Sequence, residues 1–546
     1  MTTTTILYNA NILKNAKTDF KKQTNQAILI KDNRIAAIES SETLLSLLNS
    51  KNSDDKSIVA IDVKNNYILP GFIESHAHIL GIGRMKLRLN LSNSKSEEEM
   101  VQRVLDYKSK YKNDSWILGR GWDQNLMDKK DLPTNDLLSK LIPDTPVLLT
   151  RVDGHAALAN KLALQLAKIT NDKDISNPVD PAGGKILRHT NGEPTGILID
   201  NAIDLVRNIV PKETIDAKRE FLNMAINECL KMGITTLVEA QSDKDIIYLL
   251  REFKERGELK IRVYPFMELL DSRFSDFNDL NNNNENENIK GVKIFLDGAL
   301  GSYGAYLEEP YQDNPSEIGL KTISESDLGE IFKWAQENGI QVAAHALGDG
   351  AVKYFLDVYE KNWKAKDLRF RIEHAELINP QDIKRIKELG IILSMQPTHC
   401  TSDMHWIEKR IGRDRAMERF CIWKSLLKEG IPLAFGTDAP IESLNPFDTI
   451  YAAISRQDEF SWPQNGFNSK ERLSINETIM AMTENAAYAI FQEENIGTIA
   501  VGKLADIIVI DKNIIDERIA IQNPKELLNT KVLLTMVNGL IHHNAF

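Results

Sequence analysis

The sequence predicts an α/β fold: a (β/α)8 barrel of the TIM type, joined to a small β-sandwich that both ends of the chain build together. Three observations predict it. Short apolar segments alternate with longer amphipathic segments through the middle of the 546-residue chain, eight of the apolar segments can form strands, and further strand-like segments occur at both ends. Alternating strands and helices are typical of a parallel sheet, and eight such units suggest a closed barrel.

The two ends of the chain carry the strands of the predicted sandwich. Residues 1–66 contain the apolar segments ILYNANIL, QAILIKDNRIAAIES and SIVAIDV, and residues 490–546 contain ADIIVIDK and VLLTMVNGLI. The Asp32-Asn33 step between two apolar segments is a hairpin signal. Because neither set of strands can bury a core alone, we expect residues 1–66 and 490–546 to form one composite domain.

Residues 67–489 carry the predicted barrel. Several of its strands follow an amphipathic helix that a glycine ends, and Gly339 and Gly390 stand where a helix C-cap is expected. The eight expected strands cover residues 67–73, 233–240, 259–266, 291–298, 340–346, 370–376, 391–397 and 432–438.

A long interval, residues 81–232, separates the first two predicted barrel strands. Loops of this length without secondary structure are not expected inside compact domains. The interval also has helical and strand patterns of its own, so we expect it to form an inserted subdomain over the barrel mouth.

The composition narrows the classes of partner. The chain has 67 Lys and Arg against 78 Asp and Glu, which gives a net charge of −11, and it contains no basic block. This pattern argues against a nucleic-acid or anionic-membrane partner. No run of about eighteen apolar residues occurs, so no membrane-spanning helix is expected.

Three scattered cysteines, Cys229, Cys400 and Cys421, are too few for a disulfide framework. We interpret each as a small buried side chain in a reducing compartment. The first residues, MTTTTILYNANILKN, lack the basic and apolar regions of a secretion signal. The sequence therefore predicts a cytoplasmic protein.

Two of the ten histidines, His76 and His78, end the apolar segment GFIESHAH. Residues i and i+2 of a strand point to the same face, so both imidazoles would aim at one point. Side chains at the C-terminal ends of barrel strands share one central site, and imidazole and carboxylate are ligands that zinc accepts. Four other predicted strands carry, at comparable positions, Lys293, His345, His374 and Asp438.

Taken singly, each of these residues has a simpler explanation. A lone histidine at a strand end is more often a hydrogen-bonded structural residue than a ligand, and Asp438 before Ala-Pro could organise a turn. Because four histidines and one carboxylate occupy equivalent positions of successive units, we interpret these five as metal ligands.

Lys293 lies inside the apolar segment VKIFLDG. An uncompensated ammonium among apolar residues is costly, so a buried lysine is expected to be paired or chemically altered. One alternative is an ordinary salt bridge to a carboxylate. The other is a carbamate, formed when the neutral amine captures carbon dioxide, and such an anion can bridge two cations.

The set HxH, Lys, His, His and Asp, in this order and on these strands, resembles the amidohydrolase superfamily of metal-dependent hydrolases. The resemblance narrows to the branch that includes N-substituted formamide deformylase, amidohydrolase family 3. HAH alone would be a weak signal, but the group of motifs is specific. The resemblance runs from Tyr67 to GTIAVGKLADIIVID and includes LGRGWDQNLM, PVLLTRVDGHAALAN, VKIFLDGALGS, HALGDGAV, RIEHAEL, SMQPTH and GTDAP.

The resemblance implies one or two divalent ions, with zinc as the expected metal, and the split β-sandwich at the termini. Two positions depart from the branch: Glu239 stands where the branch more often has His-Asp, and Gly350 where it often has arginine. Glu239 could therefore replace a contact behind the ligands. The implied ligands are His76, His78, Lys293 as a carbamate, His345, His374 and Asp438.

Further polar residues are candidates for substrate contacts, and each has a structural alternative. A tryptophan is also a core anchor, an Asp-Gly step also forms a turn, and a serine also caps a segment. Glu373 and Glu376 flank His374, and we expect one to orient a ligand and the other to form a salt bridge. The candidates for substrate contact are Trp122, Asp123, Asp153 and His155 in the insertion, and Ser302 and His399 in the barrel.

The site and the resemblance together imply hydrolysis of a non-peptide amide, such as an N-substituted formamide, by metal-activated water. Asp438 would be both ligand and base: it takes the water's proton and passes it to the leaving nitrogen. Deamination or opening of a cyclic amide on the same scaffold is one alternative. A catalytically silent interaction protein is another, which six filled ligand positions argue against. The expected partner is a small amide, and the sequence leaves a homodimer open.

Overall fold

The computed structural model describes most of the chain, in two compact units. One unit comprises Met1–Ile79 and Ala225–Phe546, and the other comprises Leu80–Met224. The second unit overlaps the predicted insertion at 81–232. The described residues are 4–16, 19–49, 58–111, 115–151, 156–169, 180–181, 184–269, 274, 277, 280, 289, 291–362 and 367–546.

The first unit contains the predicted barrel. Eight parallel strands pair in sequence order, each with the next, and the last contacts the first, so that the barrel is nearly closed. All eight correspond to strands expected from the sequence, and the predicted fold class is confirmed. The strands are β6 (Phe72–Ala77), β13 (Ile234–Ser242), β14 (Arg262–Glu268), β15 (Gly291–Phe295), β16 (Gln341–Ala346), β17 (Arg371–His374), β18 (Ile392–Met395) and β19 (Leu433–Phe435).

Backbone hydrogen bonds join the first and last barrel strands just past their C-terminal ends. The amide of Asp438 donates to the carbonyl of His76 at 2.7 Å, and the amide of His78 donates to the carbonyl of Ala439 at 2.8 Å. Main-chain bonds therefore hold the histidine pair of β6 next to the carboxylate that follows β19.

Apolar side chains fill the N-terminal half of the barrel. Strands that are buried on both faces read as near-continuous apolar runs, as these do. On β6, Ile73 precedes Glu74 and His76, and on β16, Ala343 precedes His345, so the C-terminal ends of these strands carry the polar side chains. The core includes Ile73, Val238, Phe266, Ala343, Ile392 and Ala434 from the strands, and Ala486, Ala487 and Ala489 from α19 (Glu484–Ala489).

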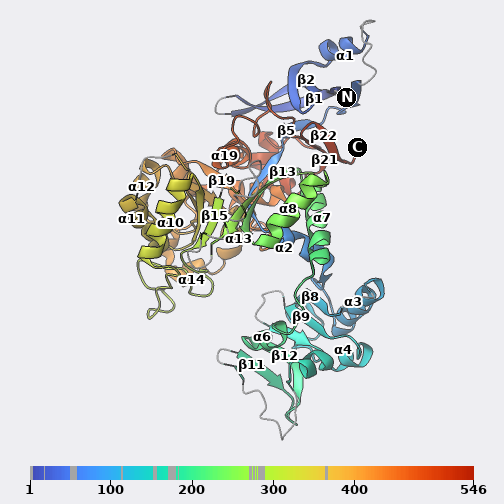
Figure 1. Cartoon of the computed structure of the whole chain (residues 1–546), viewed down its shortest axis with the longest axis vertical. Coiled ribbons are helices and arrows are strands. Elements are labelled where there is room, and N and C mark those ends of the chain that lie inside the picture. The colour runs from blue at the N-terminus through green and yellow to red at the C-terminus, as the bar shows by residue number, and fades with distance from the viewer. Residues whose placement is uncertain are drawn as a thin grey trace. The chain divides into compact units, whose positions relative to one another are not determined.

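Helix α10 (Glu325–Asn338) shows how the sequence sets helix ends. The Ser324 hydroxyl accepts a hydrogen bond from the first turn, and Gly339 ends the helix in the left-handed conformation, with φ of 68°. Two more barrel helices, α11 (Asp349–Asn362) and α12 (Ile383–Glu388), lie near α10 (Figure 1). The face that α10 buries consists of Leu328, Ile331, Phe332 and Ala335.

The other described helices are short or amphipathic. No described helix is long and apolar enough to cross a membrane. Those of the first unit are α1 (Ser41–Asn49), α8 (Lys244–Glu255), α13 (Pro397–Asp403), α14 (Ile407–Ile411), α15 (Arg413–Arg419), α16 (Trp423–Lys428), α17 (Pro446–Ser455) and α18 (Ile475–Ala481). Two helices continue from one unit into the other: α2 (Ile79–Leu87) and α7 (Ile215–Lys231).

Both ends of the chain lie in one mixed sheet of eight strands (Figure 1). The predicted hairpin is present, with Asp32 and Asn33 as its turn. Strands from the two ends share one apolar core, as expected for a sheet that both termini build together. The strands, in sheet order, are β22 (Leu540–Asn544), β21 (Val532–Val537), β20 (Ile507–Ile510), β5 (Tyr67–Pro70), β1 (Thr4–Ala16), β2 (Asp19–Lys31) and β3 (Arg34–Ser40), and β4 (Ile58–Asp62) pairs with β1.

The segment expected as the first barrel strand, residues 67–73, divides at Gly71 into strands of two different sheets. β5 pairs with β1 and β20 of the terminal sheet, whereas β6 pairs with β13 of the barrel. A Cβ on Gly71 would lie 2.2 Å from the side chain of Thr235. The chain therefore passes from the terminal sheet to the barrel through a point that has room only for glycine.

The second unit has a six-stranded sheet and its own core. Trp122 at the end of β8 is fully buried in that core. Its helices are α3 (Glu97–Lys110), α4 (Asp136–Leu141), α5 (Lys161–Leu166) and α6 (Ala202–Arg207). Its strands, in sheet order, are β11 (Gly184–Arg188), β12 (Pro194–Asp200), β10 (Ala156–Ala159), β9 (Val147–Arg151), β8 (Ile117–Trp122) and β7 (Leu89–Asn90).

Candidate metal centre

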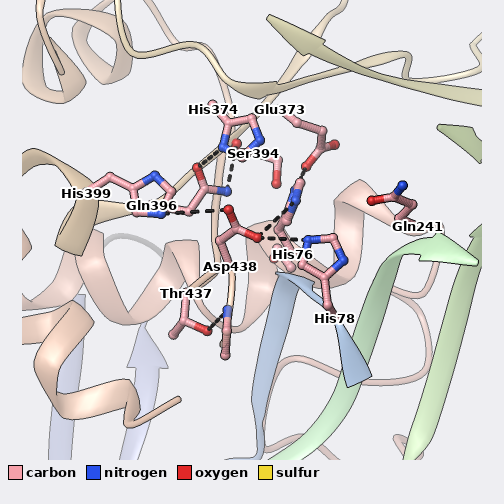
Figure 2. Close-up of polar contacts among 12 residues, drawn as sticks. His76, His78, Gln241, Glu373, His374, Ser394, Gln396, His399, Thr437 and Asp438 are labelled. Carbon is pink, nitrogen blue, oxygen red and sulfur yellow. Dashed lines mark hydrogen bonds and ion pairs between the residues drawn. The ribbon is translucent and has the colours of Figure 1, made fainter. Parts of the chain in front are cut away.

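The histidine pair of β6 faces the carboxylate that follows β19 (Figure 2). Asp438 Oδ1 lies 3.1 Å from His78 Nε2 and 3.6 Å from His76 Nε2. His76 is buried, whereas 30% of the His78 side chain is exposed. The HxH spacing on one strand thus brings both imidazoles to the same carboxylate oxygen.

Two further histidines lie within ring-contact distance of this pair. The ring of His374, at the end of β17, lies 4.8 Å from that of His76 and 4.7 Å from that of His345 on β16, measured between centroids. Imidazoles from three strands therefore meet at the C-terminal end of the barrel, as the sequence predicts for neighbouring strand ends.

Two of the expected ligands have an unusual backbone conformation. His374 has a φ of 72° and Asp438 a φ of 57°, in the left-handed region that residues other than glycine rarely adopt. Such conformations persist only where the surrounding structure fixes them, and they concentrate at functional sites. The hydrogen bond from the Asp438 amide to the His76 carbonyl is one such constraint.

A buried relay of charged groups orients His76. Its Nδ1 lies 2.5 Å from Oε2 of Glu373, and Arg371 donates from Nε and Nη2 to the two oxygens of Glu373, at 2.8 and 3.1 Å. Burial alone would raise the pKa of the Glu373 carboxyl, but the Arg371 guanidinium and the hydrogen bond with His76 hold that pKa well below its usual range. Because Nδ1 is hydrogen-bonded to a carboxylate, Nε2 of His76 is the nitrogen that can bind a metal ion.

Gln396 orients His374 in a similar way. His374 Nδ1 lies 3.0 Å from Gln396 Oε1, and a carbonyl oxygen can only accept, so Nδ1 carries the proton. Nε2 of His374 is then the unprotonated nitrogen, which is the form that binds a metal.

The buried histidines are held neutral. Burial, together with the nearby ammonium of Lys293, lowers the pKa of His76 to about 4 and that of His345 to about 3. Burial also lowers the pKa of His374 well below its ordinary value. At neutral pH these imidazoles are therefore in the form that donates a lone pair to a cation.

Lys293 on β15 is buried beside these histidines, with 1% of its surface exposed. Burial lowers the pKa of its ammonium to about 8, although the carboxylates of Glu373 and Asp438 act in the opposite direction. Among the described residues, no hydrogen bond or ion pair within 4.0 Å involves its Nζ. The ordinary salt bridge considered from the sequence is therefore absent from the described part of the chain.

His399 on α13 joins the cluster from the other side of Asp438. Its Nε2 lies 3.7 Å from Asp438 Oδ2, its Nδ1 lies 3.3 Å from Glu376 Oε1, and its ring stacks on that of His374. Burial would lower the pKa of His399, but the hydrogen bond with Glu376 and the charge of Asp438 raise it to about 9. The sequence predicts a substrate contact for this residue, whereas the structure places it next to Asp438.

The arrangement fits a divalent cation. Two groups of three residues could each hold a metal ion, and Asp438 belongs to both. The first group adds His76 and His78, and the second adds His374 and His399. Within each group the possible ligand atoms lie within 4.8 Å of one another. Buried polar atoms without a hydrogen-bond partner are rare and costly in native proteins. Oδ1 of Asp438, the atom nearest to His76 and His78, is such an atom among the described residues, and Nε2 of His345, 3.7 Å from Oδ1 of Asp297, is another. A cation bound at Asp438 would satisfy its Oδ1.

Glu74 lies behind the predicted ligands and is not identified from the sequence. Glu74 accepts hydrogen bonds at 2.9 Å from the amides of His76 and Thr437 and from the Thr437 hydroxyl, so it fixes both sides of the barrel seam. Glu239, the position that departs from the branch, accepts from the amides of Ile79 and Gln241, so it holds the backbone next to His78. The sequence does contain a signal for Glu74: it stands two residues before the HxH pair and therefore on the same face of the strand.

The candidates for substrate contact lie in different places. The Trp122 indole donates to the Leu149 carbonyl at 2.7 Å, and Asp123 pairs with Arg151 at 2.8 Å, both within the second unit. Ser302 is exposed, and its hydroxyl donates to the Ala299 carbonyl. Asp153 and His155 lie outside the described residues.

A nearly closed barrel, a sheet built from both termini and a cluster of histidines around one aspartate define the class of metal-dependent hydrolases. An uncharacterised metal-dependent hydrolase from Pyrococcus furiosus has this fold, with a TM-score of 0.74 and 28% sequence identity over 94% of this chain and 100% of that one. The chain belongs to the amidohydrolase family, whose sequence profile matches residues 59–543.

Named relatives extend over nearly the whole chain. LONG AFTER FAR-RED 3 from Arabidopsis thaliana is 33% identical, over 94% of this chain and 87% of that protein, and YtcJ from Bacillus subtilis is 33% identical, over 94% and 95%. N-substituted formamide deformylase from Arthrobacter pascens is 24% identical, over 98% of each protein. These similarities confirm the resemblance that the motifs indicated.

Proposed function

We propose that this protein hydrolyses a carbon–nitrogen bond of a small non-peptide amide, with N-substituted formamides as the first substrates to test. The observation that carries the proposal is the approach of His76 and His78 to one oxygen of Asp438, with the ring of His374 against that of His76 and the ring of His345 against that of His374. The similarity to a formamide deformylase supports the choice of substrate class.

One or two divalent cations, with zinc as the expected metal, would be held by His76, His78, His345, His374 and Asp438. A divalent cation at such a site acts as a Lewis acid that activates water and polarises a carbonyl. Imidazole nitrogen and carboxylate oxygen are the ligands that zinc prefers at catalytic sites.

Asp438 is the residue that moves the proton. Its carboxylate accepts a proton from the attacking water and delivers that proton to the leaving nitrogen, while the hydroxyl adds to the carbonyl carbon and the C–N bond breaks. An amine is a poor leaving group unless it is protonated, so a carboxylate next to the reacting carbon suits amide cleavage. The main-chain bond from Asp438 to His76 keeps this carboxylate in place during the transfer.

Lys293 is proposed to be a carbamate. Its Nζ attacks the carbon of carbon dioxide, an N–C bond forms, and the loss of a proton from nitrogen gives an anion. Three observations favour this: the side chain is buried, burial lowers its pKa to about 8, and no described residue pairs with its ammonium. A carbamate would offer two oxygens to the same cluster that the histidines surround.

The proposal is tested with protein that a chelator has stripped of metal and that has been reloaded with zinc. We expect the reloaded protein, but not the stripped one, to release amine from an N-substituted formamide. Asp438→Asn should lower that rate about 10²–10⁴-fold, because the proton acceptor is gone. Glu429→Gln, which removes an exposed carboxylate, is the matched control and should leave the rate unchanged.

Acyl amides, cyclic amides and aminated heterocycles complete the substrate panel. Ring opening of a cyclic amide, or ammonia release from a heterocycle, without amine release from any formamide would move the function to the alternatives on the same scaffold. A fully zinc-loaded protein that turns over no member of the panel would contradict the proposal.

A further inference from the structure

Phe295 is the last residue of β15, and it is partly exposed, whereas the other residues of this strand are buried. β15 pairs with β16 in unbroken register, so Lys293 and Phe295, two positions apart, lie on the same face of β15. Nζ of Lys293 lies 5.2 Å from the centroid of the Phe295 ring. The ring is therefore one step nearer to the C-terminal end of the barrel than the buried lysine.

Ring contacts connect Phe295 with the candidate metal centre. Its ring centroid lies 5.2 Å from that of His345, its partner in the register with β16. The rings of His345 and His374 lie 4.7 Å apart, and those of His374 and His76 lie 4.8 Å apart (Figure 2). Nε2 of His76 lies 3.6 Å from Oδ1 of Asp438. Asp438 and Phe295 are therefore the two ends of one row of side chains.

The order of the strands places the two ends of this row on opposite sides of the barrel. Counted from β6, β15 is the fourth and β19 the eighth of the barrel strands, and β19 contacts β6. Strands that are four places apart in a nearly closed barrel of eight face each other across its axis. Phe295 at the end of β15 and Asp438 after β19 therefore approach the site from opposite sides.

Hydrogen bonds fix the backbone next to the Phe295 ring. The Leu296 amide donates to the His345 carbonyl at 2.9 Å, and the Thr322 hydroxyl donates to the Phe295 carbonyl at 2.6 Å. The buried side chain of Asp297 accepts from two backbone amides that follow β16, at 3.1 and 2.9 Å. Groups on rigid elements set a binding geometry more precisely than groups on loops. The ring is thus a fixed boundary of the site.

The direction of the proposed reaction decides which part of a substrate meets this ring. The leaving nitrogen has to lie next to Asp438, because that carboxylate delivers the proton to it. The group on the carbonyl carbon extends away from the leaving nitrogen, and hence from Asp438 toward the other end of the row. The acyl group of the substrate therefore faces Phe295, whereas the N-substituent lies on the side of Asp438.

We propose that Phe295 sets the acyl specificity of this site: its ring limits the group on the carbonyl carbon to hydrogen or a small alkyl group. This inference rests on the proposed function and narrows its substrate class to formamides and amides of short acyl groups. The ring leaves the size of the N-substituent unrestricted, because that group lies on the opposite side.

Two isomeric hydroxamic acids test this boundary without any turnover. Hydroxamic acids bind a zinc ion through their two oxygens. Butyrohydroxamic acid carries a propyl chain on its carbonyl carbon, and N-propylformohydroxamic acid carries the same chain on nitrogen. In calorimetric titrations of the full-length, zinc-loaded protein, we expect the wild type to bind the formyl isomer at least tenfold more tightly.

Phe295→Val should reverse much of this preference. The variant makes room on the acyl side, and each methylene group that is buried there strengthens binding about fourfold. We expect butyrohydroxamic acid to bind at least tenfold more tightly than it binds the wild type, and its isomer to change less than threefold. Valine suits a strand. Phe295→Leu, which keeps most of the volume, should shift the preference less than Phe295→Val does.

Phe491→Ala is the matched control. It removes another partly exposed phenylalanine ring, which contacts Arg369. This variant should bind both isomers as the wild type does, and zinc counted per chain checks that all proteins are equally loaded. A ring that only shields Lys293 would change the affinity for both isomers alike. An equal change for both isomers, a larger change for the N-propyl isomer, or no change in Phe295→Val would overturn the proposal.

A kinetic comparison applies the same test to substrates. The formamide, the acetamide and the butyramide of one amine are compared by kcat/KM in the wild type and in Phe295→Val. We expect the ratio of butyramide to formamide to rise at least tenfold in the variant, because the intrinsic reactivity of each amide cancels between the two proteins. Damage to the fold would lower all three values together, and an unchanged ratio would contradict the proposal.

The two arms separate failure of the inference from failure of the proposed function. If the wild type hydrolyses the formamide but neither the isomer preference nor the substrate ratio changes in Phe295→Val, the role of Phe295 is refuted and the hydrolase proposal stands. If the isomer preference shifts as expected but no amide is hydrolysed, Phe295 borders the acyl side of the site and the proposed reaction is refuted.

Discussion

His76 shows how single residues prepare this site. Its Nδ1 faces Glu373, its Nε2 faces Asp438, and its carbonyl receives the Asp438 amide, so three separate contacts define one ring. Burial keeps the ring neutral, with a pKa of about 4. A ligand fixed in position and in protonation state before a cation arrives loses little conformational entropy on binding.

We predict that Glu373→Gln weakens zinc binding about 10–100-fold, because the carboxylate that orients His76 is replaced by a neutral amide. The same change leaves the fully buried Arg371 guanidinium without its counter-charge, which should lower the free energy of unfolding by about 3 kcal/mol. Chelator competition measures the first effect and urea unfolding the second. Unchanged zinc affinity would show that Glu373 does not orient a ligand.

Replacing Lys293 distinguishes a carbamate from a free lysine. If it is a carbamate that bridges two ions, Lys293→Ala loses zinc and activity together, and small carboxylic acids in solution restore part of the activity. Lys293→Arg should not restore either, because guanidinium stays cationic and cannot act as a ligand. Zinc ions counted per chain measure the outcome. Full zinc content with wild-type activity in Lys293→Arg would contradict the carbamate.

At the scale of elements, the site depends on where strands stop. β17 ends at His374 and β19 ends three residues before Asp438, and both residues adopt the left-handed conformation. The change in backbone conformation takes these side chains out of the alternation of the strand. The HxH pair needs no such change, since alternate positions of β6 already share a face.

The junction between β5 and β6 allows a test at this scale. Gly71→Ala would bring a Cβ within 2.2 Å of the Thr235 side chain, so we expect the free energy of unfolding to fall by about 1–3 kcal/mol. Gly301→Ala is the control, because the nearest atom to its Cβ would be 3.8 Å away. Thr235→Ala in the same chain should restore part of the loss. Equal stability of the two glycine variants would argue against close packing at Gly71.

At the scale of the whole molecule, the sequence predicts the fold well because its signals are local. Each barrel strand appears as a short apolar run after a helix, and the HxH pair appears as two positions of one strand. The division of residues 67–73 at Gly71 was not predicted, because both halves are equally apolar and only their partners, β1 and β13, distinguish them.

Contacts between distant parts of the chain explain the rest of what the sequence did not show. Gln396, which follows the next strand, is hydrogen-bonded to His374. Arg371 on β17 donates hydrogen bonds to the Ser75 carbonyl and the Ser394 hydroxyl, which belong to two other strands. No period or motif encodes such pairs.

The terminal sheet predicts a dependence between the two ends of the chain. β21 pairs with β20, β20 with β5, and β5 with β1, so removal of residues 532–546 uncovers the core that the N-terminal hairpin shares. Hydrogen exchange in β1, β2 and β3 should become faster in the truncated protein, as measured by mass spectrometry. Unchanged protection of these strands after truncation would refute a shared core.

The central claim, that the histidines and Asp438 form a metal centre, is tested most directly by counting zinc ions per chain at equilibrium with limiting free zinc. We predict one or two ions in the wild type and in His543→Ala, a histidine of β22 outside the cluster. The double change His76→Ala and His78→Ala should reduce the zinc content and abolish amine release. A double variant that keeps the wild-type zinc content and activity would contradict the account.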